Sequence, residues 1–368
     1  MWIYEHKNWP KFTWDMGKLS NELASVRYNQ GRLLGKMENL GFDLQLEASL
    51  NTMTQDIVKS SAIEGENLNM KEVRSSVARR MGIDVETFFT VNRDVDGIVD
   101  IMFDAMQNFE KQLSMDRLFS WHSALFPAGR SRLYKIAVGR WRTVETEPMQ
   151  VISGAYGHEK IHYVAPHAGV VENEMETFLR WFDNDIAIDP VLKAGIAHFW
   201  FVTIHPFEDG NGRLARVIAD LALARADKVS LRFYSLSKQI EKEKEDYYSE
   251  LERQQRGTPD ITRWLEWFIG CLERAIRNSG EILDTVIHKA ELWKKVNEKP
   301  VNERQRMIIN IMLGDGFKGN MNTSKYAKIA KCSNDTALRD IQELKERGIF
   351  IQNQGGGRST SYRLANNI

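Results

Sequence analysis

Residues 205–216 read HPFEDGNGRLAR, and the elements on either side of this stretch follow from it. Residues 194–204 before it are apolar enough for a buried helix, which Pro206 ends because proline disfavours helical backbone in the residue that precedes it. Residues 214–226 after it, LARVIADLALARA, are strongly helical. The sequence therefore predicts two helices joined by a short loop, with His205 at the end of the first helix and facing that loop.

The loop Gly210-Asn211-Gly212 opens onto the N-terminus of the second helix and predicts an anion site. Two glycines let the backbone approach a ligand closely, while the free N–H groups of the first turn and the helix dipole favour negative charge. Arg213 and Arg216 are three residues apart on one helix face, so both are placed to reach the same polyphosphate. Phosphate is therefore the anion we expect.

Asp209 and His205 add metal and acid–base chemistry to this anion site. A carboxylate beside phosphates is repelled unless a divalent cation bridges the two, so Asp209 predicts Mg²⁺. A histidine titrates near neutral pH, with an unperturbed pKa of about 6.5. His205 is thus placed to take a proton from an attacking hydroxyl. The stretch combines a base, a metal ligand and a phosphate cradle.

The string resembles the signature of the Fic family, HxFx(D/E)GNGRxxR, at every specified position. The resemblance implies that His205 is the general base that activates a Ser, Thr or Tyr hydroxyl of a target protein, or of the chain itself. That hydroxyl attacks the α-phosphate of ATP, so that AMP is transferred and pyrophosphate leaves. The resemblance further implies that Phe207 anchors the loop in the core, that Asp209 binds Mg²⁺ and that Asn211 takes part in catalysis.

The resemblance also assigns the nucleotide contacts. Family members that phosphorylate have lysine near Gly212, so a full GNGR favours nucleotidyl transfer. Tyr247 and Gln255 are the candidates on the adenine side, although the asparagine that the family pattern leads us to expect there is not evident. The ATP-binding set is therefore Gly210, Asn211, Gly212, Arg213, Arg216, Tyr247 and Gln255.

Residues 139–166 predict a β-hairpin, because two runs of β-branched and aromatic residues flank a Gly-Ala-Tyr-Gly turn. By resemblance this hairpin is the family's flap. The edge of the flap pairs with the target segment by β-augmentation and positions its hydroxyl. Thr143 and Val144 are the residues that we expect to do so.

The string Ser60-Ser61-Ala62-Ile63-Glu64-Gly65 matches the inhibitory motif (S/T)xxxE(G/N) of the class that carries its inhibitor on the N-terminal side. Ser60, Glu64 and Gly65 are the inhibitory residues that it implies. A glutamate paired with Arg216 removes the cation meant for the γ-phosphate and repels ATP into an unproductive pose. Two alternatives stay open: the string is also a common helix-capping pattern, and Glu64 could position a water that removes AMP.

The amino-acid composition limits the classes of protein to which the chain can belong. With 42% hydrophobic and 27% charged residues, the chain is typical of a soluble globular protein. Its 50 Lys and Arg balance 50 Asp and Glu, so no overall charge marks a general nucleic-acid or membrane-surface binder. The two cysteines, Cys271 and Cys332, favour a reducing compartment. No leader-like start or long apolar run is present, so we expect a cytoplasmic protein without a membrane span.

Helical spacing of apolar residues before and after the hairpin predicts a mainly α-helical fold. The sequence NEKPVNE, residues 297–303, interrupts this pattern and marks a domain boundary. We predict an N-terminal helical segment that carries the inhibitory helix (1–105), a Fic catalytic core with its flap (106–298) and a winged helix-turn-helix domain (299–368). This order resembles that of bacterial Fic proteins with three segments.

The C-terminal segment reads as a basic module. Residues 302–368 contain eleven Lys or Arg and six Asp or Glu, a net charge of +5. Helices are expected at 304–313, 324–330 and 335–347, followed by two strands around three glycines, as in a β-wing. The last helix is expected to bury Ala337, Leu338, Ile341 and Leu344.

Two roles for this module stay open at this stage. As a DNA binder, it would present Arg339, Lys345 and Arg347 from the third helix and Arg358 from the wing to phosphates and a groove. As a docking domain, it would present a target protein or a second subunit of a homodimer to the active site. The alternative function for the whole chain is a DNA-binding transcriptional regulator that uses the Fic fold as a nucleotide sensor. Within the enzyme class, transfer of another nucleotide, such as one from UTP, is a further alternative.

Overall fold

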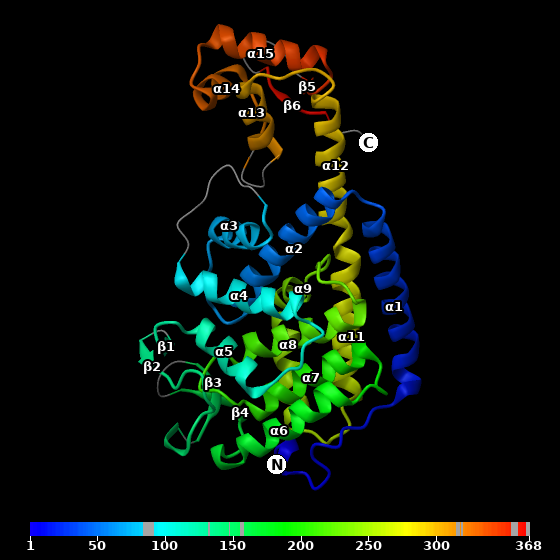
Figure 1. The fold of residues 1–368 in the computed structure, drawn as a ribbon, viewed down its shortest axis with the longest axis vertical. Coiled ribbons are helices and arrows are strands. Elements are labelled where there is room, and N and C mark those ends of the chain that lie inside the picture. The colour runs from blue at the N-terminus through cyan, green and yellow to red at the C-terminus, as the bar shows by residue number, and fades with distance from the viewer. Residues whose placement is uncertain are drawn as a thin grey trace. The chain divides into compact units, whose positions relative to one another are not determined.

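The computed structural model describes residues 1–83, 92–131, 133–146, 148–154, 158–313, 317, 319–354 and 360–365. The chain divides into two compact units, Met1–Gly280 and Glu281–Ile368. Both are built mainly from α-helices with short antiparallel strand pairs, as the sequence predicts (Figure 1). In the described part of the chain, no helix is long and apolar enough to cross a membrane.

The first unit begins with a 3-10 turn and continues as a run of helices. Between α5 and α6 this run is interrupted by short strands and a second 3-10 turn. The helices are α1 (Met16–Glu38), α2 (Phe42–Ile63), α3 (Met70–Arg80), α4 (Arg93–Gln107), α5 (Met115–Leu125), α6 (Ala168–Asn184), α7 (Pro190–Ile204), α8 (Asn211–Asp227), α9 (Leu236–Lys242), α10 (Lys244–Gln255) and α11 (Thr262–Asn278). The remaining elements are η1 (Ile3–Glu5), β1 (Arg130–Ser131), β2 (Tyr134–Lys135), η2 (Val144–Thr146), β3 (Gln150–Ser153) and β4 (Lys160–Val164).

Helices α7 and α8 pack against each other at the centre of this unit (Figure 1). Helix α7 is apolar all round and almost wholly buried, as expected of a core helix. Asp189 caps its N-terminus by accepting hydrogen bonds from the N–H groups of Val191 and Leu192, and Pro190 occupies the first turn, where its missing N–H costs nothing. Helices α6 and α11 cover α7, while α2 and α4 cover α8. The central pair thus fixes the turn between them.

Residues 236–255 form two helices, α9 and α10, instead of one continuous helix. The break falls at Glu243, whose backbone leaves the helical region with φ −111° and ψ 29°. Its carboxylate accepts two hydrogen bonds from the guanidinium of Arg274 on α11, both of 2.6 Å. That contact lies 31 residues away in sequence, so local spacing could not reveal it.

The predicted hairpin is present as the antiparallel pair β3–β4, with Gln150 opposite Val164 and a register shift after Val151. Gly154 follows β3 with φ +108°, a backbone conformation that favours glycine. The rest of the predicted turn, residues 155–157, lies outside the described residues.

The N-terminal residues pack against helices of the first unit. Thr13 forms a parallel bridge with Asp260 just before α11. Trp9 and Phe12 pack edge-on against Trp200 of α7, and the indole N–H of Trp9 donates to Glu174 at 2.9 Å. The segment therefore extends the aromatic core of the first unit.

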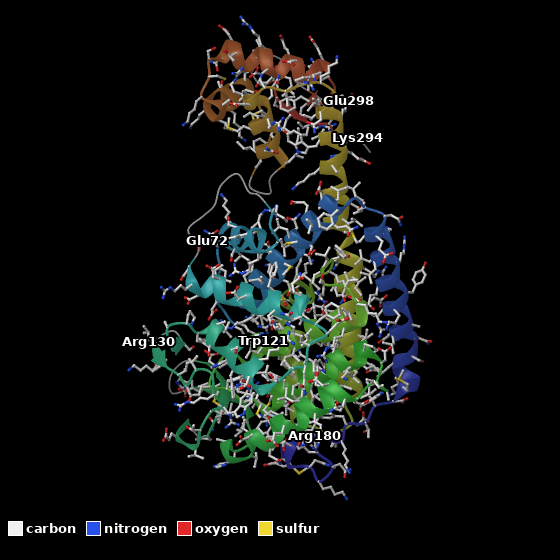
Figure 2. The ribbon with its side chains drawn as sticks, in the orientation of Figure 1. Glu72, Trp121, Arg130, Arg180, Lys294 and Glu298 are labelled. Carbon is white, nitrogen blue, oxygen red and sulfur yellow. The ribbon has the colours of Figure 1, made fainter. Side chains whose placement is uncertain are left out.

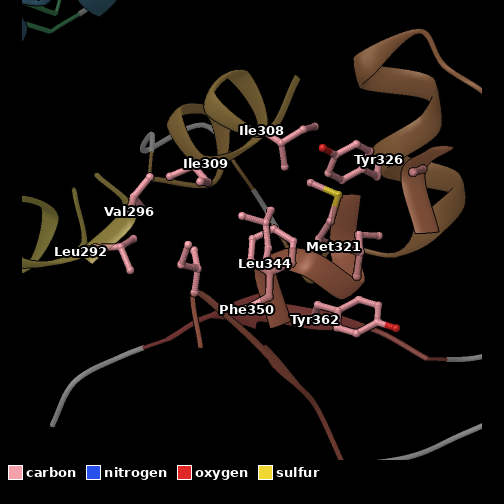
Figure 3. Close-up of a cluster of buried hydrophobic side chains, with 12 residues drawn as sticks. Leu292, Val296, Ile308, Ile309, Met321, Tyr326, Leu344, Phe350 and Tyr362 are labelled. Carbon is pink, nitrogen blue, oxygen red and sulfur yellow. The ribbon is translucent and has the colours of Figure 1, made fainter. Parts of the chain in front are cut away.

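The second unit has the element order predicted for a winged helix. It comprises α12 (Gly280–Val296), α13 (Glu303–Leu313), α14 (Thr323–Ala330), α15 (Asn334–Glu346) and the antiparallel strands β5 (Phe350–Gln352) and β6 (Tyr362–Leu364). Its core gathers side chains from every one of these elements, among them Leu292 and Val296 of α12 (Figure 3). The sequence had assigned α12 to the preceding segment.

One core residue predicted for α15 is misplaced. Ala337, Ile341 and Leu344 are buried, but Leu338 is 39% exposed. Residues 337, 341 and 344 follow the four- and three-residue spacing of one helix face, and the position after Ala337 points about 100° away from it. Leu338 therefore faces outwards.

Two of the four predicted DNA contacts in this unit are engaged inside the protein. The guanidinium of Arg347 donates to the carbonyls of Val296, Lys299 and Pro300 at 2.7, 2.7 and 3.2 Å, and Lys345 donates to Gln352 at 2.8 Å. Arg358 lies outside the described residues. These contacts weaken the expectation that the third helix reads DNA.

Candidate active site

Residues 205–212 comprise the connection from α7 to α8 and the first two residues of α8. We call them the 205–212 loop, and they are held in an unusual backbone conformation. His205 ends α7 in the left-handed region with φ 52° and ψ 57°, and Gly210 precedes α8 with φ 81°. A Cβ atom on Gly210 would lie 2.8 Å from Leu125 and 2.9 Å from the ring of Phe126. Glycine is therefore required at residue 210 for backbone and for space.

The side chain of Asn211 closes this loop. Its Oδ1 accepts from the backbone N–H of Phe207 at 2.9 Å, and its Nδ2 donates to the carbonyl of Phe207 at 2.8 Å. Asn211 is 1% exposed, so the pair of hydrogen bonds is shielded from water. The sequence predicts that Asn211 takes part in catalysis and in phosphate binding. In the structure, both polar atoms of its side chain bond the backbone of Phe207, so Asn211 acts as a positioning residue.

Phe207 anchors the loop in the core, as the sequence predicts. Its fully buried ring stacks on His122 of α5, with ring centres 4.1 Å apart and planes at 8°. Trp141 packs on Phe207 at 4.9 Å. The loop is thus fastened to α5 and to the segment that leads into the hairpin.

Arg142 and His122 are two supports that the sequence analysis missed. Arg142 is 2% exposed; its Nε donates to the carbonyl of His205 at 2.8 Å, its backbone N–H donates to the carbonyl of Pro206 at 2.9 Å, and its Nη2 bonds the carbonyl of Pro166. No local signal marks Arg142, because these partners lie far away in sequence. His122 shares the buried face of α5 with Leu118, and that spacing could have marked it as a buried polar residue.

His122 holds the backbone next to the predicted metal ligand. Its Nδ1 accepts from the N–H of Gly139 at 3.2 Å, so its Nε2 carries the proton and donates to the carbonyl of Asp209 at 3.2 Å. Burial lowers the pKa of His122 to about 4. A neutral imidazole therefore supports the loop at neutral pH.

His205 presents a free lone pair. Because a carbonyl oxygen only accepts, the bond of 3.2 Å between Nδ1 and the carbonyl of Val202 places the proton on Nδ1 and leaves Nε2 unprotonated. Desolvation by the surrounding residues, together with the charge of Arg142, lowers the pKa of His205 to about 4. The imidazole is thus neutral at physiological pH and able to accept a proton at Nε2.

Asp209 provides one carboxylate at the mouth of the loop. Its Oδ2 bonds the hydroxyl of Ser131 and its Oδ1 the N–H of Gly210. Among the described residues, no group of three or more His, Cys, Asp or Glu side chains could by itself hold a metal ion. Mg²⁺ is commonly held by one or two carboxylates together with substrate phosphates, and Asp209 beside the N-terminus of α8 fits such a shared site.

The two arginines of α8 are each paired with a glutamate from the end of α2. Arg216 is 1% exposed and donates through Nη2 to Oε1 of Glu64 at 2.8 Å, while its Nε donates to the hydroxyl of Ser60 at 2.9 Å. Arg213 donates through Nη1 to Oε2 of Glu66 at 2.6 Å. The sequence predicts the first pair and misses Glu66, although a second carboxylate two residues after Glu64 was a visible signal.

The carboxylate of Glu64 lies against the first turn of α8. A Cβ atom on Gly212 would collide with Oε1 of Glu64, so only glycine at residue 212 lets the carboxylate reach this position. The N-terminus of a helix is where an anion is stabilised by free N–H groups and by the helix dipole. Glu64 thus occupies the place that the sequence assigns to phosphate.

A Schellman motif brings both glutamates to the arginines. We call residues 60–66 the α2 cap. Gly65 has φ +81° and donates to the carbonyl of Ala62 at 3.0 Å, and the N–H of Glu66 donates to the carbonyl of Ser61 at 3.0 Å. The capping alternative noted for this string is therefore real, and it is the geometry that orients Glu64 and Glu66.

Comparisons with known proteins agree with this geometry. A model described as the Fic/DOC family matches residues 112–223, which contain the 205–212 loop, and a domain of unknown function, DUF4172, matches residues 2–83. This chain carries a Fic/DOC family domain.

The curated relatives of this chain are distant and longer. The protein adenylyltransferase Fic of Nematostella vectensis is 25% identical over 229 residues, which cover 60% of this chain and 47% of the relative. The protein adenylyltransferase fic-1 of Caenorhabditis elegans is 24% identical over 199 residues, 50% of this chain and 35% of the relative. The chain thus spans less than half the length of these two relatives.

Two solved structures share the fold. A Fic family protein from Desulfovibrio desulfuricans G20 is similar with a TM-score of 0.51 at 21% identity, covering 93% of this chain and 95% of that chain. A Fic-domain-containing signaling protein from Bacteroides thetaiotaomicron has a TM-score of 0.52 at 18% identity, covering 70% of this chain and 98% of that chain. At these identities the likeness establishes the fold.

On the predicted adenine side of the Fic site, Tyr247 is 1% exposed and its hydroxyl bonds Nε2 of His198 at 2.9 Å. Burial lowers the pKa of His198 to about 3, so His198 is a neutral, packed residue of α7. Gln255 is 5% exposed, and its Nε2 lies 3.5 Å from the hydroxyl of Thr203. The side chains of both predicted residues thus extend from α10 and contact α7.

Thr143 and Val144, the residues expected to position the target segment, lie outside the strands of the hairpin. Thr143 precedes the short η2 turn, and Val144 begins it with 59% of its surface exposed. Arg256 covers the outer edge of β4 by donating to the carbonyls of Ile161 and His162 at 3.2 and 3.3 Å. Within the described residues, β3 pairs only with β4, so β3 is the edge open to an added strand.

Proposed function

We propose that this chain is a protein adenylyltransferase, a nucleotidyltransferase that moves AMP from ATP to a Ser, Thr or Tyr hydroxyl of a target protein. The observation that carries the proposal is the 205–212 loop, which sets an unprotonated Nε2 of His205 beside an anion-binding helix N-terminus with two arginines. The names of the curated relatives support the same activity.

In this reaction, Nε2 of His205 takes the proton of the acceptor hydroxyl. The hydroxyl oxygen then forms a bond to the α-phosphorus of ATP, and the bond from that phosphorus to the β-phosphate oxygen breaks to release pyrophosphate. The backbone N–H groups of residues 211–213 and the two arginines stabilise the negative charge that develops. Mg²⁺ held by Asp209 would supply further positive charge at the phosphates.

The orientation of these N–H groups depends on side chains that do not contact the phosphates. Asn211 fixes the loop through Phe207, and Arg142 fixes the carbonyl of His205. Donors that are already oriented before the substrate arrives cost no reorganisation during the reaction. The loop is therefore preorganised for transfer as soon as nucleotide can enter.

The proposal includes autoinhibition by Glu64. In the structure its carboxylate binds Arg216 and lies against Gly212, so the γ-phosphate of ATP would meet a negative charge where it needs a cation. Two like charges about 4 Å apart repel by roughly 4 kcal/mol at the effective dielectric constant of a protein surface. We expect the chain to transfer AMP slowly until the α2 cap moves.

The activity is tested by intact-mass spectrometry of the Glu64→Gly variant after incubation with ATP and Mg²⁺. The expected result is a mass increase of one AMP per modified hydroxyl, on the chain itself or on a target protein in the mixture, and none after His205→Ala is added. Parallel incubations with UTP, GTP and CTP establish the donor. If Glu64→Gly gains no nucleotide mass from any donor, with the protein folded, the proposed activity is wrong.

A further inference from the structure

The β1–β2 hairpin, residues 130–135, concentrates positive charge in a unit that is acidic as a whole. Its six residues read RSRLYK and include three Lys or Arg and no Asp or Glu. No acidic residue occurs anywhere between residues 117 and 144. Residues 1–280 together contain 35 Lys or Arg and 40 Asp or Glu, a net charge of −5. The hairpin is therefore a local exception, although the side chain of Arg132 lies outside the described residues.

Two of these cations face each other across the hairpin. Arg130 lies directly opposite Lys135 in the register of β1 and β2, and like charges at opposite positions destabilise a strand pair. Both residues are exposed, and neither side chain has an ion pair or a hydrogen bond within the described part of the chain. Arg130 projects from β1 at the outer edge of the first unit (Figure 2). An anion bound beside both side chains would offset their repulsion.

The tip of the hairpin is apolar and open to solvent. Leu133 is 85% exposed and Tyr134 is 77% exposed. Tyrosine and arginine are enriched at interfaces between proteins and among the residues that contribute most to binding. A free phosphate ion or the backbone of a nucleic acid offers no apolar side chain for Leu133 to contact. The apolar tip beside unpaired cations therefore favours an acidic protein segment as the partner.

The hairpin is tied to the 205–212 loop by residues of β1 and residues just after β2. The hydroxyl of Ser131 bonds Oδ2 of Asp209, and the N–H of Ala137 donates to Oε2 of Glu208 at 3.0 Å. The same loop begins with His205, which presents the unprotonated Nε2. A polypeptide segment bound to the hairpin is therefore held beside the loop that would accept the proton of its hydroxyl.

We propose that the β1–β2 hairpin is a docking element for the target protein, and that it binds an acidic segment of the target with an apolar side chain near the acceptor hydroxyl. Carboxylates of this segment pair with Arg130 and Lys135, and its apolar side chain packs on Leu133 and Tyr134. Opposite charges on the two surfaces also speed their association. The identity of the partner as the target rests on the function proposed above.

Binding is tested with a fluorescein-labelled random copolymer of glutamate and tyrosine, titrated with the full chain and followed by fluorescence anisotropy. Charge reversal by Arg130→Glu with Lys135→Glu should raise the Kd by about tenfold or more, and Leu133→Ser with Tyr134→Ser should also raise it. The matched controls lie at exposed positions of α1: Arg32→Glu with Lys36→Glu, and Tyr28→Ser. Both controls should keep the parental Kd.

Three results would overturn the proposal. The first is absence of binding to the parent chain, and the second is a Kd that both hairpin variants leave unchanged. The third is a preference for a copolymer of lysine and tyrosine, or for a single-stranded oligothymidine that displaces the acidic copolymer and loses affinity in the same variants. That last outcome would assign the hairpin to nucleic acid. Because the hairpin variants change exposed residues at different positions, a folding defect in one of them does not decide the outcome.

The role in AMP transfer has its own measurement, made in the Glu64→Gly background with the acidic copolymer as acceptor. Arg130→Glu with Lys135→Glu should raise the KM for the copolymer and leave the KM for ATP unchanged. A rise in the KM for ATP instead would place the hairpin at the nucleotide and contradict the proposal. If Glu64→Gly transfers AMP to no acceptor, the failure lies with the proposed function, and the anisotropy titration still decides whether the hairpin binds an acidic segment.

Discussion

The 205–212 loop and the α2 cap meet at the same two arginines, but they are held in different ways. The loop is fastened by buried contacts: Phe207 is fully buried, Asn211 is 1% exposed and Arg142 is 2% exposed. The cap reaches the arginines through glutamates whose side chains are 31% exposed at Glu64 and 39% exposed at Glu66. A helix end with partly hydrated ion pairs opens far more easily than a loop whose hydrogen bonds are shielded from water.

Under the proposed function, this difference separates catalysis from regulation within one site. The groups assigned to catalysis are held by buried contacts, whereas the glutamates assigned to inhibition lie at the partly exposed end of α2. The loop should therefore respond to substitution with a loss of activity, and the cap with a gain. The following predictions are ordered by the size of that response.

The largest effect is expected for Asn211→Ala. The substitution leaves the buried N–H and carbonyl of Phe207 without partners, at a cost of about 1–3 kcal/mol for each group, and frees the loop. Measured in the Glu64→Gly background, the rate of AMP transfer should fall by about a hundredfold. Asn39→Ala, at the exposed end of α1, is the control that should keep its rate. A parental rate in Asn211→Ala would show that the loop holds its shape without this side chain.

Acid should destabilise the region behind the loop. The pKa of His122 is lowered by burial to about 4 in the folded chain, against about 6.5 when unfolded. The unfolded state thus binds the proton more tightly, so this contribution to stability is complete above about pH 6.5 and shrinks as the pH falls towards 4. The shift corresponds to about 3 kcal/mol.

Urea unfolding at pH 7 and at pH 5 measures this effect. The midpoint of the parent chain should be lower at pH 5, and the difference should shrink in His122→Gln, which keeps an N–H donor for the carbonyl of Asp209 but does not titrate. An unchanged pH dependence in His122→Gln would assign the acid sensitivity to other groups, among them His198 and His205.

A smaller loss is expected for Arg142→Leu. It removes the side-chain donor to the carbonyl of His205 while leaving the ring of His205 and the N-terminus of α8 in place, so the rate of AMP transfer should fall by about tenfold in the Glu64→Gly background. Arg140→Leu, two residues earlier and exposed, is the matched control. Equal rates of AMP transfer in the two leucine variants would show that Arg142 does not position the loop for catalysis.

The smallest effect, and one of opposite sign, is expected for Glu66→Gln. A partly exposed ion pair contributes about 0–1 kcal/mol, so weakening the pair with Arg213 should raise the rate of AMP transfer by about two- to fivefold. The rise should be smaller than that of Glu64→Gln, because Glu64 binds the more deeply buried arginine. A larger rise in Glu66→Gln than in Glu64→Gln would show that Glu66 is the stronger inhibitor of the two.

The sequence could predict those parts of the site whose chemistry is local. The turn after His205, the end of α7 and the pairing of Glu64 with Arg216 follow from spacing and from the resemblance to a known signature. Arg142 could not be found in this way, because its role depends on carbonyls more than 20 residues away. The break at Glu243 depends in the same way on Arg274.

Other differences reflect geometry that the residue types alone do not fix. Asn211 was expected at the phosphates, but an amide has a donor and an acceptor, and the backbone of Phe207 offers a partner for each. Thr143 and Val144 were expected on the edge of the hairpin, but the strands begin later, at Gln150, and leave β3 as the open edge. Leu338 shows that a leucine within a helix is not always on its buried face.

The central claim is that Glu64 and the γ-phosphate of ATP compete for Arg216 beside a loop that is otherwise ready to react. The most direct measurement is the initial rate of label transfer from α-labelled ATP, compared between the parent chain and Glu64→Gly at equal protein concentration. The account predicts a rate at least tenfold higher in Glu64→Gly, and its complete loss when His205→Ala is added. An equal or lower rate in Glu64→Gly, with the variant folded, would contradict it.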